Sequence, residues 1–223
     1  MIKGIFFDAA DVFYRRPQRT DEYVANLLQA NGFTTELASD ALDQRQALRG
    51  QANRGNVSHT TYWDRHLLLH GVTNPNQRET LVNQIVDYSN HVITIPGGRE
   101  AMAGLKQRGF ILGIVTDTMY PLEWKMRWLI QVGVAEFVDV VACSTVLGVH
   151  KPDPVIYLDA INQAKLTPTV SAFVGHDKCE LEGACKAGLA TVAVNYDADA
   201  KADYYAQSLI DLLNVPIFQT AST

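Results

Sequence analysis

Three apolar runs of this sequence end abruptly in residues that are able to do chemistry. These residues are Asp8 after GIFF, Thr116 and Asp117 in the segment ILGIVTD, and the polar segment 176–180 after SAFVG. A carboxylate such as Asp8 is able to attack an electrophile when a nearby cation balances its charge. Lys151, in the segment HKPDP, is a candidate for that cation. Asp8 is therefore a candidate nucleophile.

Strand and helix patterns that could position these residues alternate along the sequence. Short apolar runs are typical of strands buried on both faces, and we predict strands over 4–7, 111–116, 138–143, 171–175 and 190–194. Helical patterns lie between the later runs, over 97–109, 121–133, 153–165 and 180–188. Alternation of this kind predicts an α/β fold with a doubly wound, Rossmann-like parallel sheet. Ligands of such sheets bind beyond the carboxyl ends of the strands, where the chemical residues stand.

Between the first two strands the pattern changes to four successive helical segments. We therefore expect two units: an α/β core of residues 1–17 and 93–223, and a small helical-bundle cap of residues 18–92. An insertion after the first strand would lie above the strand ends and could close over a ligand. The final residues, FQTAST, are expected to form a loose tail.

Composition and charge narrow the class of partner. The 223 residues include 47% hydrophobic residues and carry a formal net charge of −5, which offers no electrostatic footprint for nucleic acid or an anionic membrane. We expect a small anionic substrate, and a monomer or homodimer. The three cysteines show no CxxC spacing, and no signal peptide pattern begins the sequence, so free thiols in a cytoplasmic protein are the simplest reading.

Four segments at the predicted sheet edge, in order, are GIFFDAADV, LGIVTD, LGVHKPDPVIY and FVGHDKCELEGA. Together they resemble the four motifs of the haloacid dehalogenase-like superfamily, in the branch with a helical cap between motifs one and two. The resemblance implies a hydrolase in which Asp8 forms a covalent aspartyl-enzyme intermediate. It assigns charge neutralisation to Lys151, phosphoryl contacts to Thr116, and a substrate contact to Asp117.

The first departure from the family pattern is Ala10. Phosphatases of this family carry a second Asp there, which protonates the leaving alcohol and activates water; alanine cannot transfer a proton. Such a loss typically costs on the order of 10² to 10⁴ in rate. Asp11 is a possible substitute, although one step along an extended segment would turn its side chain away, and a turn-stabilising role is the alternative.

The second departure lies in motif four, where the usual Gly-Asp reads Gly175-His176. The resemblance implies Mg²⁺ held by Asp8, the main-chain carbonyl of Ala10, Asp177 and Glu180. The spacing of motif four also resembles that of the metal-free dehalogenases. In this metal-free alternative, Asp177 or Glu180 would orient Lys151 and bind no cation. His176 is either a loop residue or a member of the site.

Arginines in the predicted cap and in the segment that enters it favour an anionic substrate. Arg15 and Arg45 are the candidate substrate contacts, although helical arginines are often merely solvated or paired with acids. The spacing of Asp64, His66 and His70 could suggest a metal site, but without a third ligand in register we expect a packing pair instead. Tyr62, Trp63 and Leu67 are expected to form the apolar seam of the bundle.

Three functions remain open from the sequence. The first is hydrolysis of small phosphorylated metabolites, which Lys151 and the acidic residues of motif four favour. The second is hydrolysis of another bond, such as the carbon–halogen bond of 2-haloacids, which Ala10 favours. The third is ligand binding without turnover, which Ala10 and His176 both permit.

Overall fold

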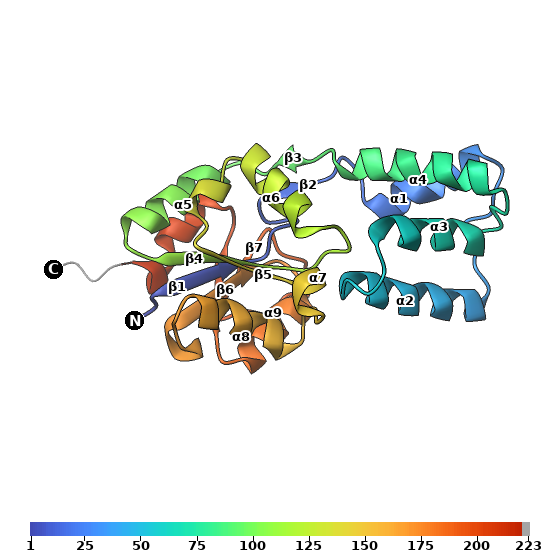
Figure 1. The fold of residues 1–223 in the computed structure, drawn as a ribbon. Coiled ribbons are helices and arrows are strands. Elements are labelled where there is room, and N and C mark those ends of the chain that lie inside the picture. The colour runs from blue at the N-terminus through green and yellow to red at the C-terminus, as the bar shows by residue number, and fades with distance from the viewer. Residues whose placement is uncertain (220–223) are drawn as a thin grey trace.

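A six-stranded parallel sheet forms the centre of the protein, for which a computed structural model describes residues 1–219 (Figure 1). The strand order is β5-β4-β1-β6-β7-β8, so the first strand lies in the middle. The bounds are β1 Gly4–Phe7, β4 Ile111–Thr116, β5 Val140–Cys143, β6 Ser171–Gly175, β7 Ala190–Val194 and β8 Tyr204–Ala206. The predicted Rossmann-like α/β sheet is confirmed.

Helices cover both faces of this sheet. Helices α5 and α6 lie on one face and α8 and α9 on the other, as Figure 1 shows. Their bounds are α5 Gly98–Gln107, α6 Leu122–Gln131, α8 Pro154–Gln163 and α9 Lys178–Lys186, with a short α7, Ser144–Leu147, before α8. Single 3-10 turns occupy Ala135–Phe137, Pro168–Val170, Ile210–Asn214 and Pro216–Phe218.

The side chains of β1 alternate between two hydrophobic cores. Ile5 and Phe7 belong to the core shared with α5, whereas Phe6 belongs to the core beneath α8 and α9. All three side chains are fully buried. This two-sided burial explains why the run GIFF has no polar alternation, and it fixes the end of β1, and with it Asp8, in space.

Four helices between β1 and β4 form a separate lobe, which Figure 1 shows beyond one end of the sheet. We call residues 18–92 the helical lobe. Its helices are α1 Thr20–Ala30, α2 Ser39–Asn53, α3 His59–Leu69 and α4 Pro75–Ser89. The seam residues Tyr62, Trp63 and Leu67 are buried as expected. Strands β2, Tyr14–Arg15, and β3, Ile93–Thr94, pair as a two-stranded antiparallel ribbon. This ribbon lies where the chain enters the lobe and where it leaves it.

Some elements differ from the sequence prediction. The edge strand β8 was not predicted, because YYA is a short run with only Ala206 buried. The expected loose tail is wrong at its first residue: Phe218 is fully buried and its ring packs 6.0 Å from that of Phe110. The rest of that prediction, at 220–223, lies outside the described residues. None of the described helices is long and apolar enough to cross a membrane.

Candidate active site

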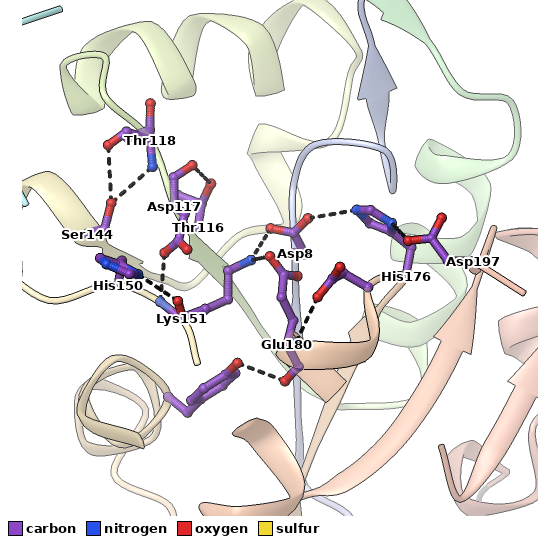
Figure 2. A network of polar contacts seen from close by, with 12 residues as sticks. Asp8, Thr116, Asp117, Thr118, Ser144, His150, Lys151, His176, Glu180 and Asp197 are labelled. Atoms are coloured by element: carbon purple, nitrogen blue, oxygen red, sulfur yellow. Dashed lines mark hydrogen bonds and ion pairs between the residues drawn. The ribbon is translucent and has the colours of Figure 1, made fainter. Parts of the chain in front are cut away.

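Asp8 and Lys151 form a buried ion pair at the carboxyl edge of the sheet. The Lys151 Nζ lies 2.5 Å from Asp8 Oδ1 and 2.8 Å from Glu180 Oε1 (Figure 2). The Lys151 side chain is 1% exposed and that of Asp8 6%. The three side chains come from three distant parts of the sequence, and the sheet topology brings them together.

The position of Asp8 follows from the central place of β1. Its N–H donates to the carbonyl of Val174 at 2.9 Å, which continues the β1–β6 ladder by one residue. On the other side β1 pairs with β4, which ends at Thr116. Because all these strands are parallel, their carboxyl ends meet at the same edge, where motifs one, two and four converge.

The KPDP segment holds Lys151 from both sides. The Lys151 N–H donates to Asp117 Oδ1 at 3.0 Å, which ties the backbone to the end of β4. Asp153 caps α8 by accepting from the Val155 N–H, and Pro154 occupies the first turn, where no N–H is needed. These contacts fix the start of α8 and hold Lys151 in contact with Asp8.

The electrostatics of the three-residue cluster reflect its burial. Burial by itself lowers the pKa of Lys151, but the charges of Asp8 and Glu180 outweigh it and raise the pKa well above its ordinary value. Burial, followed by the charge of Asp8, raises the pKa of Glu180 to about 8, although Lys151 opposes this. Lys151 is therefore held as a cation, and its closest partner is Asp8.

Thr116 and Asp117 lie beside this cluster without touching Asp8 directly. Thr116 is 1% exposed, and among residues 1–219 the hydrogen-bond partner of its hydroxyl is the carbonyl of Asp117, at 3.4 Å. Burial raises the pKa of Asp117, whereas Lys151 lowers it, and the net direction is upward. The Asp117 carboxylate accepts the hydrogen bond of the Lys151 N–H and so helps to position Lys151. Its contact with a substrate stays a prediction.

His176 lies on the far side of Asp8 from Lys151, as Figure 2 shows. Its Nε2 is 4.0 Å from Asp8 Oδ2, and its Nδ1 is 3.7 Å from Asp197 Oδ2. The sequence left open whether His176 belongs to the site; the structure brings it there. Asp197 was missed, because it follows β7 in a segment with no recognisable motif.

Ala10 and Asp11 line open space next to the cluster. Both border a cavity of about 630 Å³ between the core and the helical lobe. Asp11 has a positive φ of 56°, and its N–H donates to the carbonyl of Tyr14. This left-handed turn, which Asp adopts more readily than most residues, accounts for an acid at this position by local geometry.

The donors predicted for Mg²⁺ are only partly available. Asp177 Oδ1 accepts the Glu180 N–H at 3.0 Å and caps α9. Glu180 Oε2, in contrast, is buried with no hydrogen-bond partner among the described residues, so a cation would satisfy it. In residues 1–219 no group of three or more His, Cys, Asp or Glu side chains is placed to hold a metal. Of the predicted Mg²⁺ donors, Glu180 Oε2 is thus the one for which the structure shows an unfilled need for a partner.

Of the predicted arginine contacts, Arg15 lines the 630 Å³ cavity and Arg45 does not. Arg49, one helical turn after Arg45, lines it instead and pairs with Asp21 at 2.7 Å. Sequence reasoning also missed Tyr157, whose hydroxyl donates to the Glu180 carbonyl at 2.8 Å. Its place in LGVHKPDPVIY was the available signal.

The acid and the two histidines at metal-like spacing, Asp64, His66 and His70, do not come together as one group in the structure. Asp64 is paired with Arg78 at 2.7 Å, away from the histidines. His66 and His70 are each 5% exposed, with ring centroids 4.8 Å apart. The expected packing pair is therefore what the structure contains.

Comparisons with known proteins agree with this geometry. Residues 42–194 match the family model described as haloacid dehalogenase-like hydrolase. A Methanopyrus kandleri protein named glyceraldehyde 3-phosphate phosphatase is 27% identical over 203 residues, covering 87% of this chain and 84% of that protein.

Solved structures show the same fold. The crystal structure of a predicted phosphoglycolate phosphatase from Haemophilus somnus 129PT superposes with a TM-score of 0.69 at 20% identity, covering 96% of this chain and 97% of that one. That of 2-haloacid dehalogenase from Pseudomonas syringae pv. tomato DC3000 gives 0.67 at 21% identity, with the same coverage. The matching family model, together with the parallel sheet, shows that this chain is an enzyme of the haloacid dehalogenase-like hydrolase family.

Proposed function

We propose that this hydrolase cleaves small phosphate monoesters through a covalent aspartyl-enzyme intermediate on Asp8. The observation that carries the proposal is the buried contact of 2.5 Å between Asp8 and Lys151. A carboxylate whose charge is balanced by a fixed ammonium at a sheet edge is able to attack in line. The Methanopyrus kandleri relative named as a phosphatase supports phosphate monoesters as the substrate class.

The reaction consists of two displacements. An oxygen of Asp8 forms a bond to phosphorus while the bond from phosphorus to the alcohol oxygen breaks. Water then attacks the phosphorus of the aspartyl phosphate, which releases inorganic phosphate and restores Asp8. Lys151, with Thr116 close by, would balance the negative charge on the transferred phosphoryl group.

Proton transfer is the step for which this site is least equipped. Ala10 leaves the departing alcohol without the usual acid, so esters of acidic alcohols should react fastest. The positive φ of Asp11 and its hydrogen bond to Tyr14 favour a structural role for that residue.

Magnesium binding is a further part of the proposal. The carboxylates of Asp8 and Glu180 and the carbonyl of Ala10 would hold the ion. When bound, it would add positive charge beside the phosphoryl group. The unpartnered Oε2 of Glu180 supports this, whereas the capping role of Asp177 argues against its inclusion.

The helical lobe is proposed to act as a cap, with domain limits at residues 18 and 92. Cavities lined by both the lobe and the core support this role, because a substrate at Asp8 would lie between them. We also retain the cytoplasmic location, for which the three free cysteines are the support, and a monomeric or homodimeric state.

Hydrolysis of a carbon–halogen bond is the second candidate. It is favoured by Ala10, because that reaction does not need the same proton delivery, and by His176 in place of the usual acid. Binding without turnover is the third possibility.

Three assays on the same preparations separate these functions. Turnover of phosphate esters with and without Mg²⁺, with wild type against Asp8→Asn, tests the first. Halide release from 2-haloacids tests the second. If neither class is turned over while phosphate raises the unfolding temperature, the third replaces both.

A further inference from the structure

Lys125 is a buried lysine that no motif predicts. It lies on α6, is 5% exposed, and its Nζ donates to the hydroxyl of Tyr14 at 3.0 Å. Among the described residues no carboxylate lies within ion-pair distance of it. Lysine is almost never buried without an anionic partner, so this position needs an explanation.

Arg16 lies near Lys125 and, like it, has no carboxylate within ion-pair distance among the described residues. Its guanidinium lies over the rings of Trp128, at 5.0 Å, and Tyr120, at 5.7 Å. Its Nε donates to the carbonyl of Ser89, and it too has no acidic partner in the described part of the chain. Lys125 lies over Trp128 as well, 5.5 Å from the ring centroid, so one indole supports both cations.

Both cations line one cavity of about 250 Å³ between the core and the helical lobe. Ala10 and Asp117, which flank the nucleophile in the sheet edge, line the same cavity. A molecule in this space would therefore extend from the neighbourhood of Asp8 toward Lys125 and Arg16.

The aromatic walls make the pair of cations unlike an ordinary basic surface. Trp63 of the lobe donates its indole N–H to Tyr120 of the core at 3.4 Å, and both residues line the cavity. Arg49, which also lines it, is already paired with Asp21. Among the cations that line the cavity, Lys125 and Arg16 are therefore the two without an acidic partner in the described part of the chain, and the nearby carboxylate of Asp117 is engaged by the Lys151 N–H.

We propose that Lys125 and Arg16 bind a second acidic group on the substrate, remote from the phosphoryl group that Asp8 attacks. The substrate class is then a small phosphate monoester with a carboxylate or a second phosphate, whose carbon chain lies against the aromatic walls. This inference rests on the proposed function and adds the specificity of its site. Lys125 and Arg16 act as specificity-determining residues, because they contact a part of the substrate that does not react.

The test compares three short esters in wild type, Lys125→Met and Arg16→Met. The esters are phosphoglycolate, its carboxamide, and ethylene glycol bisphosphate. Wild type should prefer phosphoglycolate and the bisphosphate, which carry a second acidic group, over the carboxamide by about 10- to 100-fold in kcat/KM. This is the range expected for a hydrogen bond to a charged group. Lys125→Met should abolish this preference, mainly through KM, while the carboxamide rate changes little. The ratio of phosphoglycolate to bisphosphate identifies which acid the site prefers.

Arg127→Met is the matched control, because Arg127 is an exposed cation on the same helix. It should keep the wild-type preference. Equal rates for acid and amide esters in wild type, or an unchanged preference in Lys125→Met, would overturn the inference and leave the proposed phosphatase standing.

If no ester is turned over, the proposed function fails and binding decides the inference alone. Phosphoglycolate should raise the unfolding temperature of wild type more than its carboxamide does, and Lys125→Met should remove the difference. The same ligands on Asp8→Asn give this readout without any chemistry. No difference in wild type would refute the second anion site.

Discussion

Asp8 and Glu180 share one cation: Lys151 Nζ lies 2.5 Å from the first carboxylate and 2.8 Å from the second. All three side chains are at most 18% exposed. Because the pKa of Glu180 is raised to about 8, the cluster is close to neutral at pH 7 and becomes net negative only where Glu180 ionises. An incoming phosphoryl group would add negative charge, so the cluster depends on Lys151 for stability as well as for chemistry.

Lys151→Met should lower the free energy of unfolding by about 3–5 kcal/mol, because the buried carboxylate of Asp8 loses its counterion. Urea denaturation checks this. Lys106→Met is the control: Lys106 pairs with Asp139 at the surface, where a pair contributes only about 0–1 kcal/mol. Comparable losses in both variants would contradict the argument. Adding Glu180→Gln to Lys151→Met should restore part of the stability.

Ala10→Asp should increase the rate of ester hydrolysis, by up to about 10² to 10⁴, if proton delivery limits the reaction. The cavity bordering Ala10 offers room for a carboxylate. Steady-state kinetics on esters of weakly acidic alcohols give the clearest readout. Asp11→Asn serves as the comparison, and we expect its rate to stay near wild type. A large loss in Asp11→Asn would make Asp11 the missing acid.

His176→Asp should strengthen Mg²⁺ binding by at least about 10-fold, since it adds a hard oxygen ligand beside Asp8. The rise of the unfolding temperature with Mg²⁺ concentration measures this without relying on turnover. In contrast, Asp177→Asn should leave Mg²⁺ binding unchanged, because asparagine caps a helix as well as aspartate does. Weaker binding in Asp177→Asn would restore Asp177 to the ligand set.

His66 should make the protein less stable in mild acid. Burial, followed by the charge of His70, lowers the pKa of His66 from 6.5 to about 3. The unfolded chain therefore binds the proton more readily, so stability is full above pH 6.5 and falls as the pH decreases toward 3. The expected loss at pH 5 is about 2 kcal/mol.

Urea unfolding of His66→Phe at pH 7 and pH 5 tests this contribution, because the variant should lose most of the difference between the two. His91→Gln, which changes an exposed histidine, should keep it. A pH dependence that survives in His66→Phe would place its origin elsewhere, with His70 the next candidate, since burial lowers its pKa as well.

The core elements were predictable because their signals are local. Five strands buried on both faces appear as apolar runs, and the segment HKPDP contains both the lysine and the cap of the following helix. Parallel topology then places the strand ends together, and the resemblance to the haloacid dehalogenase-like motifs predicts that Lys151 meets Asp8 there. The edge strand β8 gave no such signal, because only one of its three residues is buried.

Lys125 shows why part of the site escaped sequence reasoning. On α6 it sits between two tryptophans in the helical pattern, and nothing there distinguishes a buried cation from one that extends into solvent. Its burial depends on Tyr14, 111 residues earlier, and on the closeness of the helical lobe. The predicted contact Arg45 does not line the 630 Å³ cavity whereas Arg49 does, because helical spacing alone does not tell which arginine of α2 faces it.

The ribbon of β2 and β3 makes the polypeptide leave the sheet and return to it at neighbouring points, with Arg15 paired to Ile93. The two ends of the inserted helical lobe therefore lie next to each other, whatever the length of the insertion. A foreign domain whose own ends lie close together could be spliced in at these two positions without stretching the sheet. If the helical lobe acts as the proposed cap, substrate choice becomes exchangeable by recombination, while Asp8 and Lys151 stay where they are.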